Sequence, residues 1–243
     1  MGIIVVFLLF VGINVNAEEY FYTNNNGLNF TEFQYETMVH ILGAEMVSNL
    51  TQEDYDLYEV SNMQEETFKM ATTVDEDVSD NSCPTPYGTY YETQSKQLVL
   101  TSSCTSSYCT IIITNTWKKN PAVRSYDMIG VRLSSTYFYD DTVTSTLRMN
   151  DTNYNRSGMM GASNGVGCAM KLRSTGDVDF IVLKVRVLPQ GIVYGSYQHA
   201  VRSINLDTAL NFNFDSNGYG GVFLYPSSIG TTFDQMAGVY IVL

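Results

Sequence analysis

The residues that most clearly suggest chemistry are Cys104 and Cys109, five positions apart in the stretch TSSCTSSYCTIIITNTW. Strand-like residues flank the pair, and the four residues between the cysteines suit a hairpin loop. Two cysteines that face each other across an antiparallel pair lie within disulfide range. The sequence has neither the CxxC pairs nor the HxxxH spacing of zinc sites. The spacing therefore predicts a disulfide Cys104–Cys109 across a turn.

The two remaining cysteines, Cys83 and Cys168, suggest a second disulfide. An even number of cysteines is typical of exported proteins whose cysteines are oxidised. In the chain-entropy model a bridge that closes so long a loop stabilises by about 4–5 kcal/mol, whereas the short Cys104–Cys109 ring contributes about 2 kcal/mol. We expect the Cys104–Cys109 bridge, and the sequence leaves open whether Cys83 and Cys168 form the second one.

Enzyme chemistry would depend on a single histidine of the C-terminal two thirds, His199 in GSYQHAVRS. A Ser-His-Asp triad would have to use it, because the only other histidine is His40, on a predicted helix. The one GxSxG match, GASNG at residues 161–165, lacks the strand-to-helix setting of a nucleophile elbow. We therefore expect His199 to form a surface or interface cluster with Tyr197 and Arg202, and we assign no catalytic residue.

No metal, cofactor or nucleic acid is expected as a ligand. Within NFNFDSNGYGGVF, residues 211–223, a calcium-like loop would start at Asn213, but its twelfth position is Leu224, where an EF-hand needs glutamate. The glycine-rich SGMMGASNGVGCAM lacks the strand-to-helix setting of a phosphate loop, and it predicts a flexible loop that enters a strand. Nucleic-acid binding would need a concentrated basic patch, which the sequence lacks.

Tyrosine is abundant, with 18 residues, several of them in runs near expected loops. Tyrosine offers contact area and a hydrogen-bonding tip, which suits recognition of sugars or protein surfaces, although it is also a favoured strand residue. The candidate binding residues are Tyr137, Tyr139, Tyr194, Tyr197, His199 and Arg202. They predict a module that binds an extracellular glycan or protein surface. The alternatives are a structural protein that self-associates at the cell surface, and a hydrolase that uses His199.

The first 17 residues read as a secretory signal peptide with cleavage after Ala17. The apolar run Ile3–Val11 is too short to span a bilayer, and no later segment approaches the roughly 20 apolar residues that a spanning helix needs. We therefore expect a secreted protein that does not insert into a membrane after cleavage.

Charge divides the mature chain into two parts. Between Glu18 and Asp80 fifteen acidic residues accompany one basic residue, whereas residues 81–243 are nearly neutral. Apolar residues at helical spacing follow Thr31, and a second helix start follows Thr51, each with a capping threonine. The pattern predicts an acidic helical hairpin over residues 18–62 and an acidic linker over 63–82. The apolar face of the hairpin should pack against the rest of the protein.

Short strand-like segments separated by Gly, Asn, Asp and Ser clusters follow from residue 83 onward. In DFIVLKVRVL, alternation places Lys184 and Arg186 on one face and four apolar residues on the other. The pattern predicts a mainly β fold, with a jelly-roll-like antiparallel β-sandwich over residues 83–243.

Four segments carry a resemblance: TQEDYDLY, NTWKKNPAVRSYDMIGVRL, YGSYQHA and GYGGVF. Together they resemble a group of uncharacterised secreted proteins of Gram-positive bacteria, over most of the mature chain. The resemblance implies export and the division into an N-terminal helical part and a β part. It implies no activity.

Overall fold

The structure is a computed structural model that describes residues 20–74, 95–134, 138–155, 158–162, 164–215, 222–234 and 238–243. The predicted signal peptide, Cys83 and Tyr137 lie outside these residues. Among the helices that the structure describes, none is both long and apolar enough to cross a membrane.

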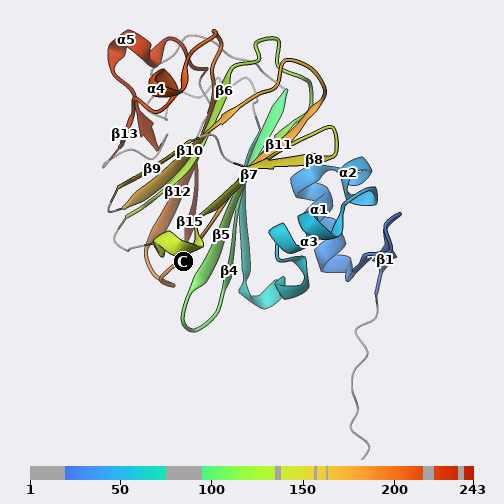
Figure 1. Ribbon diagram of the computed structural model, residues 1–243. Helices are drawn as coiled ribbons and strands as arrows, with labels where there is room; N and C mark the ends of the chain where they lie inside the picture. The colour runs from blue at the N-terminus through green and yellow to red at the C-terminus, as the bar shows by residue number, and fades with distance from the viewer. Residues whose placement is uncertain are drawn as a thin grey trace, which may run out of the picture.

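The protein is mainly β, as predicted, and its strands form antiparallel sheets (Figure 1). One large sheet has six strands in the order β3-β4-β5-β11-β7-β8, and the other has five in the order β15-β12-β6-β10-β9. Their strands are β3 (Phe68–Val74), β4 (Lys96–Cys104), β5 (Cys109–Trp117), β6 (Tyr126–Leu133), β7 (Thr144–Met149), β8 (Thr152–Asn155), β9 (Gly158–Ala162), β10 (Gly165–Lys171), β11 (Val178–Val187), β12 (Ile192–His199) and β15 (Val239–Val242).

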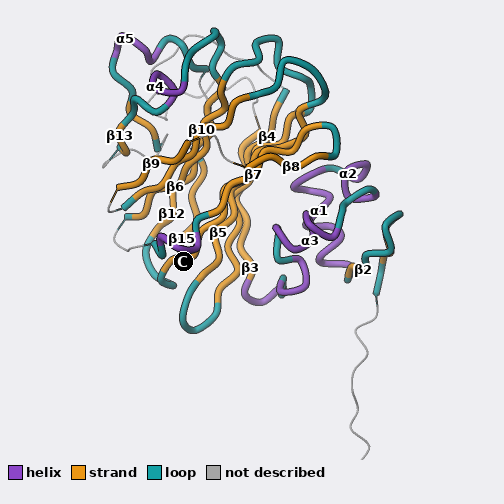
Figure 2. The backbone as a smooth tube through the Cα atoms, in the orientation of Figure 1, coloured by secondary structure: helices purple, strands orange, loops and turns teal. Residues whose placement is uncertain are grey.

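The largest apolar core draws its residues from both of these sheets, which form adjacent layers of strands in Figure 2. Because successive side chains of a strand point to opposite faces, every second residue of a strand enters this core. After the register shift between Val178 and Phe180, the core residues of β11 are Ile181, Leu183, Val185 and Val187. Lys184 and Arg186 point to the opposite face, where their side chains are 18% and 41% exposed. The alternation predicted for this strand is confirmed.

Residues 20–67 form the N-terminal unit. It contains a two-stranded hairpin and several short helices: β1 (Tyr22–Thr23), β2 (Asn29–Phe30), α1 (Glu32–Leu42), α2 (Ala44–Ser48), α3 (Gln52–Leu57), and the 3-10 helices η1 (Val60–Asn62) and η2 (Glu65–Thr67). Capping boxes start α1 and α3, with Thr31 and Thr51 as the cap residues that the sequence predicts.

The N-terminal unit packs on the outer face of the six-stranded sheet (Figure 1). A second core joins apolar residues of this unit to four residues of the sheet: Val99, Ile112, Phe180 and Val182. The expectation that the helices bury their apolar face against the β part is therefore confirmed. The expected linker over 63–82 differs from the structure, because Phe68–Val74 forms strand β3 and pairs with β4.

A C-terminal segment covers the outer face of the five-stranded sheet (Figure 1). Its elements are α4 (Leu206–Ala209), β13 (Asn213–Phe214), β14 (Phe223–Leu224) and α5 (Ser227–Gly230). A third core joins its aromatic residues to residues of β6, β10 and β12. The 3-10 helix η3 (Asp140–Thr142) lies between β6 and β7. The glycine-rich segment predicted as a flexible loop contains β9, the edge strand beside β10.

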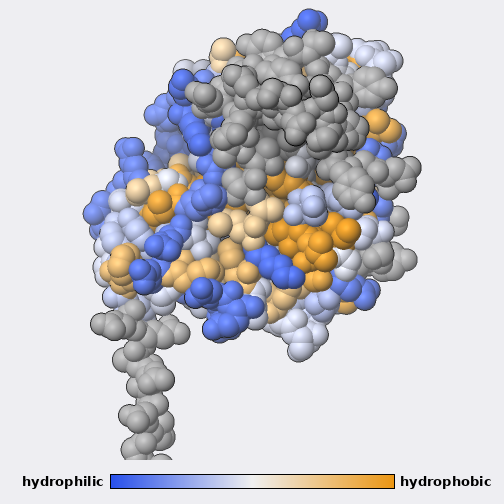
Figure 3. All heavy atoms as spheres, turned by 180° about the vertical axis from the view of Figure 1, so that it is seen from behind, coloured by the Kyte–Doolittle hydropathy of each residue, from blue (hydrophilic) through white to orange (hydrophobic). Residues whose placement is uncertain are grey.

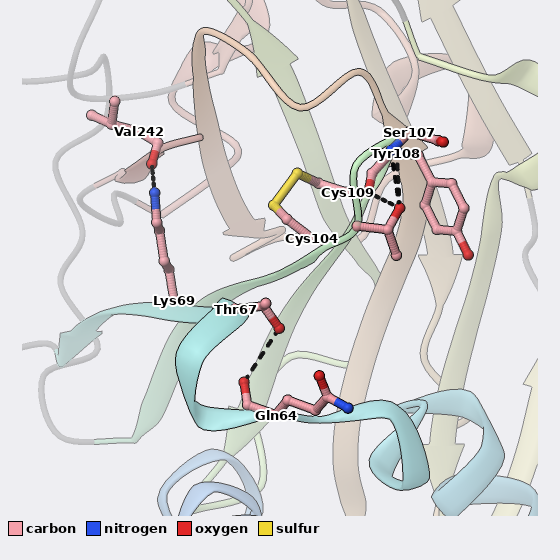
Figure 4. The surroundings of a disulfide bond; sticks show 9 residues. Gln64, Thr67, Lys69, Cys104, Ser107, Tyr108, Cys109 and Val242 are labelled. Carbon is pink, nitrogen blue, oxygen red and sulfur yellow. Dashed lines mark hydrogen bonds between the residues drawn. A yellow bond between two sulfur atoms is a disulfide. The ribbon is translucent and has the colours of Figure 1, made fainter.

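The predicted disulfide Cys104–Cys109 is present at the end of the β4–β5 hairpin (Figure 4). The two residues are a directly opposed pair with Cα atoms 4.0 Å apart. Within the loop, the Thr105 N–H donates to the Tyr108 carbonyl at 2.8 Å. Nearby, Lys69 Nζ of β3 donates to the Val242 carbonyl of β15 at 2.7 Å, which connects edge strands of the two sheets. The second predicted disulfide needs Cys83, which lies outside the described residues.

Candidate functional site

A cleft of about 760 Å³ lies where the N-terminal unit meets one end of the six-stranded sheet. Helices α1 and α2 form one wall, and the loops after β5, β7 and β10 form the other. Its polar lining residues include His40, Glu45, Asn49, Lys118, Asn150, Asp151, Asp177 and Asp179. The cleft therefore exists only because the helices are docked on the sheet.

Hydrogen bonds between the three loops hold the sheet side of the cleft in place. The Asp177 N–H donates to the Asn150 side-chain oxygen at 2.7 Å, and the Asn120 amide donates to the Asp177 carboxylate at 2.6 Å. Asn150 and Asp151 both have positive φ, 47° and 57°, in the tight turn between β7 and β8. Asparagine and aspartate tolerate this backbone conformation better than most residues. The Asn-Asp dipeptide between two strand-like segments is the sequence signal that could have revealed this turn.

The cleft is acidic. Glu45, Asp151 and Asp177 are exposed, and Asp179 is partly buried, whereas Lys118 is the only lysine or arginine among the lining residues that the structure describes. Burial raises the pKa of Asp179 above its usual value, although the Asp151 N–H and the charge of Arg148 act in the opposite direction. Arg148 lies 2.9 Å from Asp151 and 3.7 Å from Asp179 and compensates these two carboxylates from below. The exposed carboxylates of Glu45 and Asp177 are therefore the ones that most attract cations or cationic groups.

Arg148 anchors the N-terminal unit beneath the cleft, and sequence reasoning missed this residue. The guanidinium forms a buried ion pair with Asp54, the N3 residue of α3, and it also meets Asp151 at 2.9 Å. The Asn153 amide donates to the second oxygen of Asp54 at 3.1 Å. The side chains of Arg148 and Asp54 are 1% and 0% exposed, and their ion pair links two parts of the chain that are far apart in sequence. A contact of this separation has no local sequence signature.

The predicted binding residues do not come together on one surface. Tyr197 and His199 are buried at 0% and 1% exposure, so the expectation that they form a surface cluster with the exposed Arg202 is wrong. Tyr194 is 7% exposed and stacks under the Arg132 guanidinium at 4.2 Å. Tyr139 is 42% exposed in the segment between β6 and β7.

A buried polar cluster at one end of the core contains Tyr197 and His199. Strand alternation explains it, because both residues share the inward face of β12 with the core residue Val193. By the same alternation, side chains at the ends of β4, β5 and β6 also point inward. Asp234, in the segment before β15, contacts them. The cluster consists of Lys96, Trp117, Asp127, Tyr197, His199 and Asp234.

Hydrogen bonds within the polar cluster centre on His199. Its ring Nδ1 lies 2.7 Å from Asp127 Oδ1, and its backbone N–H donates to Asp234 Oδ1 at 2.6 Å. The other oxygen of Asp127 accepts from the Trp117 indole N–H at 3.1 Å. The ring Nε2 is buried and meets no hydrogen-bond partner within the part of the chain that the structure describes. The hydrolase alternative would need a serine at that atom.

Neither family models nor curated proteins match this sequence. Among solved structures, a collagen-binding domain from a Staphylococcus aureus adhesin is similar at a TM-score of 0.30 and 6% identity, over 38% of this chain and 75% of that one. A protein described as AvmM, which catalyses macrocyclisation in alchivemycin A biosynthesis, is similar at a TM-score of 0.22 and 7% identity, over 38% of this chain and 65% of that one. At these TM-scores neither likeness supports an inference about function.

Protonation of His199 should stabilise the fold. Burial lowers the pKa of His199, but the hydrogen bond with Asp127 and the charges of Asp127 and Asp234 outweigh burial, so the pKa is raised above 6.5. A histidine whose pKa is higher in the folded state than in the unfolded state stabilises the fold when it is protonated. This stabilisation is fully present below the pKa of the unfolded state, about 6.5, and is lost as pH rises through the pKa of the folded state. The unfolding free energy, measured by urea denaturation at a series of pH values, should fall over that interval.

The variant His199→Gln supplies the comparison for this pH dependence. Its unfolding free energy should vary less over the same interval, because glutamine carries no titrating proton. Equal pH dependence in the two proteins would contradict the assignment of this stability to His199.

Proposed function

We propose that this protein is a secreted, sandwich-like binding module, and that the acidic cleft binds a basic segment of a partner protein. The observation that carries the proposal is the charge of the cleft: in the described chain four carboxylates line it, against Lys118 and the buried Arg148 that pairs with Asp151. The docked N-terminal unit and the hydrogen-bonded loops preorganise both walls, which reduces the entropy that binding would otherwise cost. The disulfide and the predicted signal peptide support an extracellular location.

The cleft also supports a glycan as the alternative ligand. Asn49, Asn150 and Gln97 place amide groups beside the carboxylates, and sugar hydroxyls bind to both kinds of group. The two ligand classes differ in their dependence on salt. Attraction between a basic segment and exposed carboxylates is screened by salt, whereas hydrogen bonding to a neutral sugar is much less sensitive.

Fluorescence anisotropy with a labelled oligolysine peptide tests the proposed ligand class. Binding should weaken as sodium chloride is raised, and an oligoglutamate peptide of equal length should not bind. The double variant Glu45→Gln, Asp177→Asn should bind the oligolysine peptide roughly tenfold more weakly, which corresponds to about 1.4 kcal/mol. Both residues are exposed, so the fold should tolerate the change.

The matched control is Asp207→Asn, which removes an exposed carboxylate from α4, outside the cleft. It should leave the affinity for oligolysine unchanged. Equal losses in the control and in the cleft variant would mean that only the overall charge matters, which would contradict a site in the cleft. Salt-independent retention of a neutral polysaccharide by the wild-type chain, lost in the cleft variant, would favour the glycan alternative.

Self-association is a second candidate function, favoured by exposed apolar residues on edge strands. Seen from behind, apolar side chains gather on the lower part of the molecule (Figure 3). Tyr240 and Val242 of β15 are 52% and 56% exposed, and β15 is the terminal strand of its sheet in the described chain. Exposed edges promote pairing between chains. Light scattering over a range of concentrations should detect assembly if this surface is used, and Val242→Lys should then abolish it.

A further inference from the structure

A lysine amine and an aspartate carboxyl face each other in the interior of the protein. Lys96 Nζ forms an ion pair with Asp234 Oδ2, and both side chains are 0% exposed. Within the described residues, Asp234 is the only side chain that accepts a hydrogen bond from this amine. A buried ammonium has three hydrogen atoms to satisfy, so a single carboxylate compensates poorly for its lost hydration. The carboxyl of Asp234 is therefore the main polar compensation for the buried amine.

Aromatic rings enclose the two groups. Lys96 Nζ lies 5.5 Å from the centre of the Trp117 ring and 5.4 Å from the centre of the Tyr197 ring. Both rings are buried, and they pack edge to face at 6.2 Å. Such walls limit the lysine side chain to few orientations and hold the amine against the carboxyl. They also keep bulk water away from the pair.

The remaining groups of the polar cluster suit acyl chemistry at the Asp234 carboxyl carbon. Asp234 Oδ1 accepts the backbone N–H of His199 at 2.6 Å, so this oxygen is already polarised by a fixed donor. The His199 ring contacts Asp127 at 2.7 Å, which places a second carboxyl and an imidazole next to the pair. Carboxyl and imidazole groups are the usual carriers of protons in such steps.

We propose that Lys96 and Asp234 become joined by an intramolecular isopeptide bond between Nζ and Cγ. A proton first moves from the ammonium to the carboxylate, which leaves a neutral amine and a carboxylic acid. The amine lone pair then attacks Cγ, and negative charge develops on Oδ1 against the His199 N–H. The bond from Cγ to Oδ2 breaks, and Oδ2 leaves as water with two of the three ammonium protons. The third proton stays on the amide nitrogen.

The step needs no oxidant, activating group or cofactor, because an ammonium and a carboxylate become an amide and one water molecule. Amide formation between free molecules in water is unfavourable, but groups fixed in contact react with effective concentrations of about 10⁵–10⁸ M. Lys96 begins β4 of one large sheet, and the Asp234 N–H bonds to the carbonyl of His199 in the other. The bond would therefore tie the two sheets together across a sequence separation of 138 residues.

Mass spectrometry of the purified full-length chain, reduced and denatured, tests the bond. Its mass should be lower than the mass calculated for its observed N-terminus by one water molecule. A tryptic digest should contain a branched peptide that joins the segment of Lys96 to the segment of Asp234. A wild-type chain that retains the whole calculated mass would overturn the proposal, and the pair would then be an ion pair only.

Variants distinguish this bond from other reactions that release water and lower the mass. Lys96→Met and Asp234→Ala should each restore the full calculated mass, because each lacks one of the reacting groups. The matched control Lys184→Met removes a lysine from the opposite face of β11 and should keep the deficit. A deficit that persists in Lys96→Met would arise elsewhere, such as from cyclisation of an aspartate, and would also overturn the proposal. The masses are read on denatured chains, and circular dichroism before denaturation shows whether each variant had folded, which formation of the bond requires.

Discussion

Replacing Arg148 with methionine is expected to lower the unfolding free energy by about 3–5 kcal/mol. The guanidinium is buried and pairs with the fully buried carboxylate of Asp54, so its removal leaves an uncompensated charge under α3. Methionine keeps much of the side-chain volume but supplies no hydrogen bond to Asp54. Urea denaturation followed by circular dichroism measures the loss. Because Asp54 also belongs to the capping box of α3, the N-terminal unit should loosen first.

Arg186→Met provides the matched control for this effect. Arg186 is 41% exposed and lies 3.6 Å from Glu59, so its ion pair is partly solvated. Partly exposed pairs contribute at most about 1 kcal/mol, and the variant should be nearly as stable as the wild type. Similar losses in the two variants would mean that Arg148 has no special role in docking the N-terminal unit.

Replacing Phe180 with alanine should also cost about 3–5 kcal/mol, because it leaves a cavity between the N-terminal unit and the six-stranded sheet. Phe180 is fully buried on the outer face of β11, where its ring packs edge to face on Tyr58 at 5.8 Å. The Arg148 guanidinium lies over the same ring at 5.9 Å. Thermal unfolding followed by calorimetry should show the decrease.

Phe21→Ala is the control for Phe180→Ala, since it deletes the same atoms from a ring that is 58% exposed. Surface substitutions usually change stability by less than about 0.5 kcal/mol. If Phe180→Ala were as mild as Phe21→Ala, the second apolar core would not hold the N-terminal unit on the sheet.

Local features of the fold could be predicted because their causes lie within a few residues. Thr31 and Thr51 cap helices through groups three residues away, and the alternation in β11 follows from the geometry of a single strand. The disulfide Cys104–Cys109 needs only one hairpin. In each of these cases the sequence spacing fixes the geometry without reference to the rest of the chain.

Features that depend on distant parts of the chain could not be predicted. Residues 63–82 looked like a linker because they are acidic, yet Phe68–Val74 pairs with β4, a strand that begins more than twenty residues later. The ion pairs Arg148–Asp54 and Lys96–Asp234 join residues that only the packing of whole layers brings together. Tyr197 and His199 looked like surface residues because tyrosine and histidine suit binding, but strand alternation turns them inward.

Hydrogen–deuterium exchange of the full chain, with and without a saturating oligolysine peptide, tests most directly whether the acidic cleft is the binding site. Bound peptide should slow amide exchange on both walls, in residues 40–49 and in the loops at 118–120, 150–151 and 177–179. Exchange in α4, α5 and β15 should stay the same. Protection confined to those distant elements, with unchanged exchange on both walls of the cleft, would contradict the proposed site.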